Sequence, residues 1–299
     1  MGMSDGKPHP PAPSPSNGEG EDRRRRIIAT APDGVEIVGR VSGGGPGLLL
    51  VYGAMMEQVG WSRLAAHLPG HTVYTYDRRG RGESGVGPHP PTPSPSGGEG
   101  ELVESIARAE IDDLRAFAGA LPRPLDVFGH SSGALLVLHA MNQGMRARRL
   151  VLYEPVLPAV REPRVPADLP GRILAYVAAG DRDGAMQAFM CDGMWLSDAD
   201  IERARESERW RDQLRYVHTA AYDTHIARTY ELEPERLARL TLPVLLLVGS
   251  ESPAWMKEGV ERFAEALPDS RVDVIEGQGH NAMFSAPDVL GEQVRAFLS

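Results

Sequence analysis

The chain has 299 residues, of which 41% are hydrophobic and 24% are charged, and its formal net charge at pH 7 is -9. This length suits one large α/β domain with an insertion, or two small domains. The acidic balance argues against a general nucleic-acid binder, which needs a basic face for phosphates.

A proline-rich segment occurs twice along the chain. Residues 8–21 read PHPPAPSPSNGEGE, and residues 88–101 read PHPPTPSPSGGEGE. Proline fixes φ and removes a backbone donor, and neither copy has an apolar face that could join a core. One interpretation is a ligand for a partner domain. We favour a disordered tail over residues 1–25 and a low-complexity insertion in a surface loop over residues 88–101.

The sequence contains neither a secretory signal nor a membrane span by its pattern. The N-terminal residues are polar and proline-rich where a signal would be apolar, and the longest apolar runs are too short to cross a bilayer. The single cysteine, Cys191, excludes an intramolecular disulfide, so an oxidising compartment is not required. We expect a cytoplasmic protein that contacts neither membrane nor nucleic acid.

Strands alternate with helices after the tail. Gly34 is expected in a hairpin turn between strands near 26–31 and 35–41. Further strands are predicted at 48–52, 73–76, 125–128, 150–153, 244–248 and 271–275, and helices at 61–68, 102–120, 133–143, 254–267 and 287–298. This alternation predicts an α/β fold with a mostly parallel sheet and helices on both faces.

Residues 159–235 break the alternation, because they read as helices without a clear buried strand. We predict that they form a helical cap on a core made of residues 26–158 and 236–299. The cap is expected over the carboxyl edge of the sheet, where ligands of such sheets bind.

The strongest chemical signal is Gly129-His130-Ser131-Ser132-Gly133, which matches G-x-S-x-G. It lies between the apolar strand ending at Phe128 and an apolar helix. A nucleophile elbow needs this sharp strand-to-helix turn, which strains the serine backbone and projects its hydroxyl above the sheet. The alternative is an ordinary glycine-rich turn; the context favours Ser131 as a nucleophile.

Serine requires a base, and His280 is the best candidate of the nine histidines. It lies in Gly277-Gln278-Gly279-His280-Asn281, just after the last predicted strand. Taken alone, His280 would be read as an ordinary loop histidine. Its position after Ser131 and at the sheet edge favours the catalytic role instead.

Four features together resemble the α/β-hydrolase superfamily, whose small-molecule hydrolases use a serine nucleophile. They are the strand followed by Gly53, the segment DRRGRGESG at 77–85, the GHSSG elbow and GQGH at 277–280. The resemblance covers roughly residues 27–158 and 236–299. It implies a Ser-His-acid triad with Ser131 and His280.

The resemblance leaves the acid open between two residues. The family usually has an aspartate after the strand at 244–248, where this chain has Ser252, and Glu251 is one residue short. The other recorded position is the end of the preceding strand, which is Glu154. We favour Glu154 slightly, because a carboxylate that ends a buried strand at the active edge requires a reason to be there.

The resemblance also implies an oxyanion hole made of two backbone N–H groups. One belongs to Ser132, and the other comes from the loop after strand 48–52, with Ala54 first and Met55 second. The family's usual histidine before Gly53 is Tyr52 here.

The sequence thus predicts a serine hydrolase that cleaves a small-molecule ester, thioester or lactone, with no cofactor and no metal ion. The same triad could instead carry out C–C hydrolysis, acyl transfer or perhydrolysis. A third hypothesis is a ligand-binding member of the fold without turnover. The oligomeric state cannot be deduced from the pattern.

Overall fold

The computed structural model describes residues 25–85, 99–157, 160–162 and 164–299. The predicted tail, except Arg25, and residues 88–98 of the predicted insertion lie outside the described residues. Arg25 begins β1 (Arg25–Thr30), and the last residues of the predicted insertion begin α2 (Glu99–Gly119). The helix starts earlier than predicted; Glu101 is a good helix former whose charge suits a first turn.

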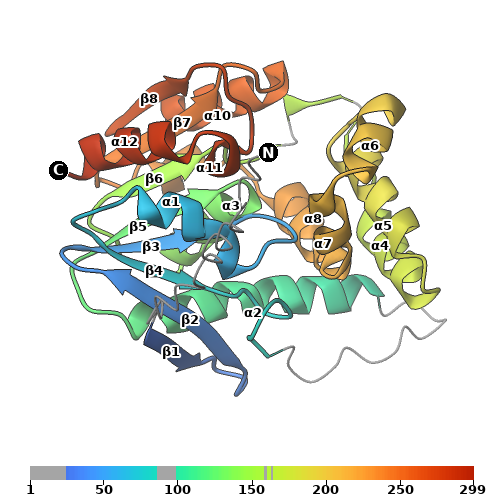
Figure 1. Ribbon diagram of the computed structural model, residues 1–299, viewed down its shortest axis with the longest axis horizontal. Helices are drawn as coiled ribbons and strands as arrows, with labels where there is room; N and C mark the ends of the chain where they lie inside the picture. Colours follow the sequence, from blue (N-terminus) through green and yellow to red (C-terminus); the bar gives the residue numbers. More distant parts are fainter. Residues whose placement is uncertain (1–24, 86–98, 158–159, 163) are drawn as a thin grey trace, which may run out of the picture.

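A single eight-stranded sheet organises the described chain, in the order β1-β2-β4-β3-β5-β6-β7-β8 (Figure 1). β2 pairs antiparallel with β1 and β4, and every other neighbouring pair is parallel. The mostly parallel sheet is therefore confirmed. The remaining strands are β2 (Glu36–Gly43), β3 (Gly47–Val51), β4 (Thr72–Tyr76), β5 (Leu125–His130), β6 (Leu150–Tyr153), β7 (Val244–Gly249) and β8 (Ser270–Ile275).

Helices cover both faces of the sheet, because its central strands are apolar on both sides. In β3, Leu49 and Val51 pack in one cluster with α2, α3 (Ser132–Asn142) and α10 (Ala254–Ala266). Leu48 and Leu50 pack on the opposite face with α1 (Ser62–Ala66), α11 (Ala282–Ser285) and α12 (Pro287–Leu298). Side chains of a strand alternate between faces, so a continuous apolar run supplies both layers.

The regular elements of the described segment between β6 and β7 are all helices, joined by turns and loops, and they form a cluster beside the sheet (Figure 1). It has its own apolar core, including Ile173, Met186 and Trp210. Ser197 and Ser207 cap two of its helices by accepting backbone N–H bonds, as expected for serine at this position. The elements are α4 (Leu169–Ala178), α5 (Arg182–Ala188), η3 (Phe189–Gly193), α6 (Asp198–Arg205), α7 (Glu208–Leu214), η4 (Val217–Thr219), α8 (Ala220–Thr229) and α9 (Pro234–Leu237).

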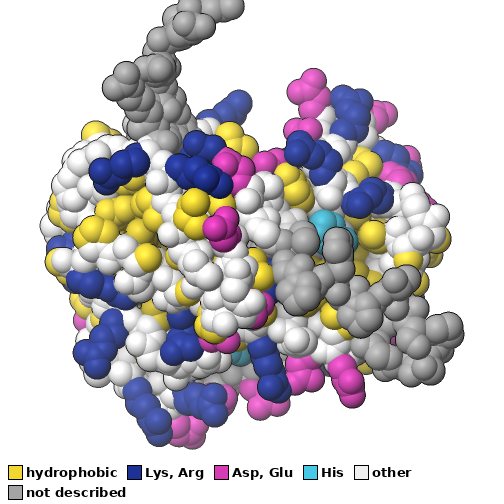
Figure 2. All heavy atoms as spheres, turned by 90° about the horizontal axis from the view of Figure 1, so that it is seen from below, with side chains coloured by type: hydrophobic (Ala, Val, Ile, Leu, Met, Phe, Trp, Pro, Cys, Tyr) yellow, Lys and Arg dark blue, Asp and Glu magenta, His cyan; other side chains and the backbone are white. Residues whose placement is uncertain are grey.

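The surface carries basic and acidic side chains side by side, and on the face in Figure 2 neither sign forms one continuous field. Many of them form short-range ion pairs within a helix, such as Arg203 with Asp200. None of the described helices combines the length and the apolar character that crossing a membrane requires.

Candidate active site

Ser131 lies in a strained turn between β5 and α3. Its φ and ψ are 56° and -130°, a region that residues with side chains rarely adopt. Gly129 and Gly133 make the turn possible: a Cβ on Gly129 would lie 2.7 Å from Ala134 Cα, and one on Gly133 would lie 2.3 Å from the Tyr52 carbonyl oxygen. The turn therefore requires glycine at both positions.

His280 joins Ser131 to Glu154. Ser131 Oγ lies 3.0 Å from His280 Nε2, and His280 Nδ1 lies 2.5 Å from Glu154 Oε2. The Glu154 side chain is fully buried, whereas that of His280 is 18% exposed. The structure thus brings a hydroxyl, an imidazole and a carboxylate into one line, with the hydroxyl at the cavity.

The loop after β7 supplies donors to Glu154. Glu154 Oε1 accepts hydrogen bonds from the Gly249 N–H at 2.8 Å and from Ser252 Oγ at 2.5 Å. Burial raises the pKa of Glu154, but hydrogen bonding and attraction to His280, with the bonds from Ser252 and Gly249, bring it below its ordinary value. The carboxyl is therefore ionised near neutral pH and accepts the Nδ1 proton of His280.

Glu251, the alternative acid, is not brought to the imidazole. Its side chain is exposed, and its nearest side-chain partner is Ser250 Oγ at 3.5 Å. The backbone N–H of Glu251 bonds to Gln278, which fixes the loop with this carboxylate outside. Ser252, at the position where the resemblance implies an aspartate, instead donates to Glu154, the residue that directly follows β6.

Two buried residues hold the loop that carries His280. His130 Nε2 donates to the His280 carbonyl oxygen at 2.9 Å. Tyr153 Oη donates to the Gly279 carbonyl oxygen and accepts the Ala282 N–H. Burial lowers the pKa of His130 well below its usual value, so this imidazole is neutral and serves as a donor to the loop.

The candidate oxyanion donors belong to two segments that adjoin Ser131, the start of α3 and the loop after β3. Ser132 is the first residue of α3, so its N–H has no intrahelical acceptor. A Cβ on Gly53 would lie 2.7 Å from Ser131 Cβ, which shows how closely the loop after β3 approaches. Ala54 lines both cavities at Ser131, and Met55 lines only the larger one.

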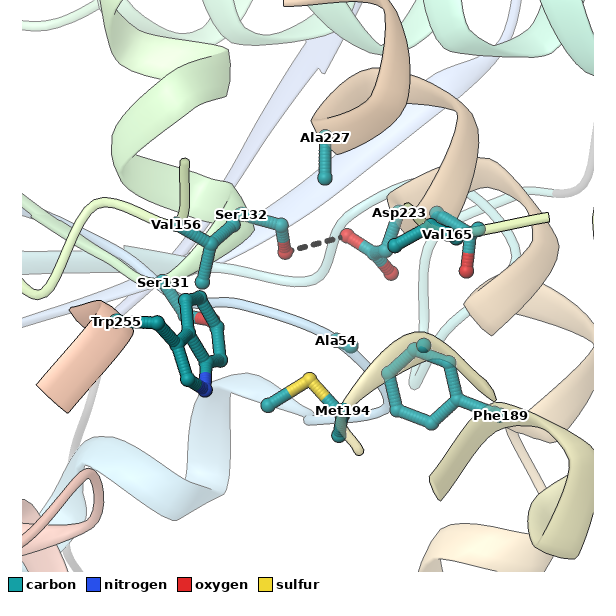
Figure 3. Close-up of a pocket in the computed structure, with 12 residues that line it drawn as sticks. Ala54, Ser131, Ser132, Val156, Val165, Phe189, Met194, Asp223, Ala227 and Trp255 are labelled. Carbon is teal, nitrogen blue, oxygen red and sulfur yellow. Dashed lines mark hydrogen bonds between the residues drawn. The ribbon is translucent and has the colours of Figure 1, made fainter. Parts of the chain in front are cut away.

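A ring of four buried charges joins the core to the helical segment, and sequence reasoning missed it. Arg78 contacts Glu110 and Asp223 at 2.6 and 2.7 Å, and Arg81 contacts the same two carboxylates at 2.5 and 2.7 Å. Asp223 also accepts a 2.7 Å bond from Ser132 Oγ, beside the nucleophile (Figure 3). The sequence of residues 77–85 is visibly rich in charged side chains, but the carboxylates that pair with its arginines lie far along the chain.

The same segment also supports the loop after β3. Asp77 accepts bonds from the backbone and side-chain amides of Gln58, both at 2.8 Å. Gly82 has a φ of +52°, and a Cβ there would collide with the Asp77 carboxylate. Tyr52 Oη accepts the Arg78 N–H at 2.9 Å, so the tyrosine at the family's histidine position links the two loops.

Two cavities meet at Ser131. The larger has a volume of about 340 Å³ and opens between the sheet edge and α7, with His280 on its wall. The smaller is about 40 Å³ and extends toward Ser132, Asp223 and Trp255 (Figure 3). Five methionines line one or both: Met55, Met56, Met190, Met194 and Met256. Within the described residues, no group of three or more His, Cys, Asp or Glu could hold a metal ion.

Comparison with known proteins agrees with this geometry at the level of the family. The sequence profile of the Alpha/beta hydrolase family matches residues 43–293. A crystal structure of an alpha/beta hydrolase from Sphaerobacter thermophilus is 32% identical, with 91% of this chain and 100% of that chain covered and a TM-score of 0.79.

Two more distant structures share the fold. They are the enol-lactonase of Burkholderia xenovorans, at 18% identity and TM-score 0.66 over 91% of this chain and 99% of that chain, and an esterase from a Rhodococcus species, at 20% and 0.64 over 91% and 98%. Among curated proteins, none matches the chain in sequence.

Proposed function

This chain belongs to the alpha/beta hydrolase family, and from that premise we propose that it is a serine hydrolase of small carboxylic esters, thioesters or lactones. One observation carries the proposal. The hydrogen-bonded line Ser131–His280–Glu154 ends at a strained elbow that faces a cavity of about 340 Å³. A cavity of this size suits a small ligand.

His280 acts as the general base. Glu154 accepts the Nδ1 proton and thereby leaves Nε2 as the acceptor that faces Ser131 at 3.0 Å. As Oγ attacks the carbonyl carbon, its proton moves to Nε2, and the ionised Glu154 stabilises the resulting imidazolium.

The backbone N–H groups of Ser132 and Ala54 hold the oxyanion of the tetrahedral intermediate. The Ser132 N–H belongs to the start of α3. The Ala54 N–H belongs to a loop that the Arg78 side chain holds by donating to the carbonyl oxygens of Tyr52 and Gly53. Preorganised donors of this kind contribute about 10²- to 10³-fold each.

The acyl-enzyme then forms and is hydrolysed. His280 returns its proton to the leaving alcohol or thiol as the C–O or C–S bond breaks. A water molecule next attacks the acyl carbon while His280 takes its proton, and the released Oγ recovers that proton from Nε2. Ester-type substrates require no further catalytic group at this site, since their leaving group needs only the proton that His280 carries.

The relatives' names give limited support, because at 18–20% identity they share only the fold. One is an enol-lactonase and the other an esterase, and both names fit the acyl transfer to water proposed here.

The test compares Ser131→Ala with Ser299→Ala, a matched change at an exposed serine outside the cavities. The first is expected to abolish turnover of short-chain p-nitrophenyl esters, and the second to leave it unchanged. Undiminished turnover by Ser131→Ala would contradict the assignment of the nucleophile. Product analysis of the wild-type reaction separates hydrolysis from acyl transfer to another alcohol.

A further inference from the structure

Arg209 brings a positive charge into the larger cavity. It lies in the first turn of α7, is half-buried, and lines the cavity together with Ser131 and His280. Its Nη2 donates to Asn281 Oδ1 at 2.9 Å, and its guanidinium lies 4.7 Å from the centre of the Phe284 ring. Both partners are neutral.

Within the described part of the chain, no carboxylate pairs with Arg209. Two other arginines of the helical segment do have carboxylate partners: Arg172 contacts Asp192 at 2.6 Å, and Arg205 contacts Asp183 at 2.7 Å. Burial lowers the pKa of Arg209, and no carboxylate offsets the effect. A partly buried charge without a counter-ion is costly, which favours a role in binding.

The guanidinium of Arg209 lies close to residues that adjoin the reacting groups. Asn281, its hydrogen-bond partner, directly follows His280 in the chain. Burial, His280 and the charge of Arg209 all lower the pKa of His130, which precedes Ser131. Because Arg209 and Ser131 line the same cavity, an anion bound to the guanidinium would share that cavity with a carbonyl under attack by Ser131.

Most of the remaining residues that line the cavity are apolar, and Ser207, Gln213 and Asn281 add neutral polar groups. Its described lining residues include neither aspartate nor glutamate. Methionine side chains are flexible and polarisable and adapt to an apolar ligand, while Trp210 and Phe189 add aromatic surface. The wall therefore suits a molecule with an apolar body and one anionic end.

We propose that Arg209 binds a carboxylate of the substrate, so that the enzyme prefers esters or lactones that carry a free carboxylate. This inference rests on the proposed hydrolase function and names its substrate class. The planar guanidinium matches a carboxylate in two parallel hydrogen bonds. That contact would orient the ester carbonyl toward Ser131 by fixing the opposite end of the substrate.

Two matched ester pairs test the proposal. p-Nitrophenyl hydrogen adipate and its methyl ester differ by a carboxylate on the acyl side, and p-acetoxybenzoate and its methyl ester differ by one on the leaving-group side. For at least one pair, wild-type kcat/KM should favour the carboxylate by about 10- to 100-fold. Which pair responds depends on whether the larger cavity, which contains Arg209, holds the acyl group or the leaving group of the ester.

Arg209→Met should reduce this preference at least about tenfold, and Arg209→Lys should retain part of it because the charge remains. The ratio within a pair cancels any general loss of activity. Arg203→Met, at an exposed arginine of α6, is the matched control and should keep the wild-type ratio. An Arg209→Met enzyme with the wild-type ratio, or a wild type without preference in either pair, would overturn the proposal.

A binding measurement separates this proposal from the hydrolase function. Calorimetry on Ser131→Ala should show p-toluate binding at least about tenfold more tightly than p-toluamide, and Arg209→Met/Ser131→Ala should lose the difference. If wild-type enzyme hydrolyses no ester but p-toluate is preferred, only the hydrolase function fails. If esters are hydrolysed and p-toluate is not preferred, only the role of Arg209 fails.

Discussion

Replacing Glu154 by glutamine tests the triad more finely than removing the serine. The glutamine Oε1 can still accept from Gly249 N–H and Ser252 Oγ, which lie 2.8 and 2.5 Å from Glu154 Oε1. The new amide N–H₂ then faces His280 Nδ1, where the carboxylate oxygen lay at 2.5 Å. Two donors cannot share that contact, so His280 must place its proton on Nε2, the atom that faces Ser131.

In that tautomer Nε2 no longer accepts the serine proton, and the imidazolium also loses its counter-charge. In serine hydrolases the equivalent change lowers kcat by about 10⁴-fold, or about 5.4 kcal/mol at 1.36 kcal/mol per tenfold. We expect a loss of this order for Glu154→Gln, measured as steady-state kcat on p-nitrophenyl acetate. Thermal unfolding would check that the variant is folded.

Glu251→Gln is the matched control, because it makes the same chemical change at an exposed carboxylate in the neighbouring loop. Its kcat should stay within about twofold of wild type, as for a surface change away from the site. The reasoning is refuted if Glu154→Gln keeps a tenth of the activity, or if Glu251→Gln is the variant that loses it.

Three further predictions concern the scaffold of the site. Gly133→Ala should lower the free energy of unfolding, measured by urea denaturation, by about 3 kcal/mol, because its Cβ would meet the Tyr52 carbonyl. Gly119→Ala, with open space around it, should change the same quantity by less than about 1 kcal/mol. Asp223→Asn should cost about 3–5 kcal/mol in the same assay by leaving two buried guanidiniums with one carboxylate, and the exposed Asp212→Asn should not; equal stability of the two would contradict the role of the charge ring. The folded-state pKa of His130 is lowered, so on acidification the unfolded chain takes up this proton before the folded one does. The free energy of unfolding should therefore fall below about pH 6.5, by about 1.4 kcal/mol per pH unit from this residue. Between pH 7 and 5, His130→Phe should show a shallower dependence of the free energy of unfolding on pH than wild type, and identical slopes would refute this.

The sheet and the elbow are predictable from sequence because their signals are local. A wholly apolar strand must be buried on both faces, and Leu48 to Val51 do pack into opposite clusters. Gly129 and Gly133 are required by contacts with residues that follow or adjoin the turn. Ser131 could therefore be identified from the strand, the glycines and the helix next to it in the sequence, and His280 from its place after the last strand.

The choice between the two acids was not decidable in the same way. Glu154 could be favoured because a carboxylate at the end of a buried strand requires a partner. Whether Ser252 would donate to it, and whether Glu251 would face solvent, depends on the path of one loop. A shift of one residue in such a loop reverses which side chain points inward.

The charge ring and the anion site lay beyond sequence reasoning for a different reason. Arg78 meets Asp223 across 145 positions of the chain, and no local periodicity encodes such a pairing. Arg209 stands out because, unlike Arg172 and Arg205, it has no carboxylate partner within the described residues and it lines the cavity at Ser131. Which charge remains unpaired is a property of the folded chain alone.

The most direct test of the account is the site of covalent labelling by a fluorophosphonate probe, measured by mass spectrometry of the intact and digested protein. We expect one adduct on wild-type enzyme, located at Ser131, and none on Ser131→Ala. An adduct at another residue, or equal labelling of Ser131→Ala, would contradict the claim that Ser131 is the nucleophile.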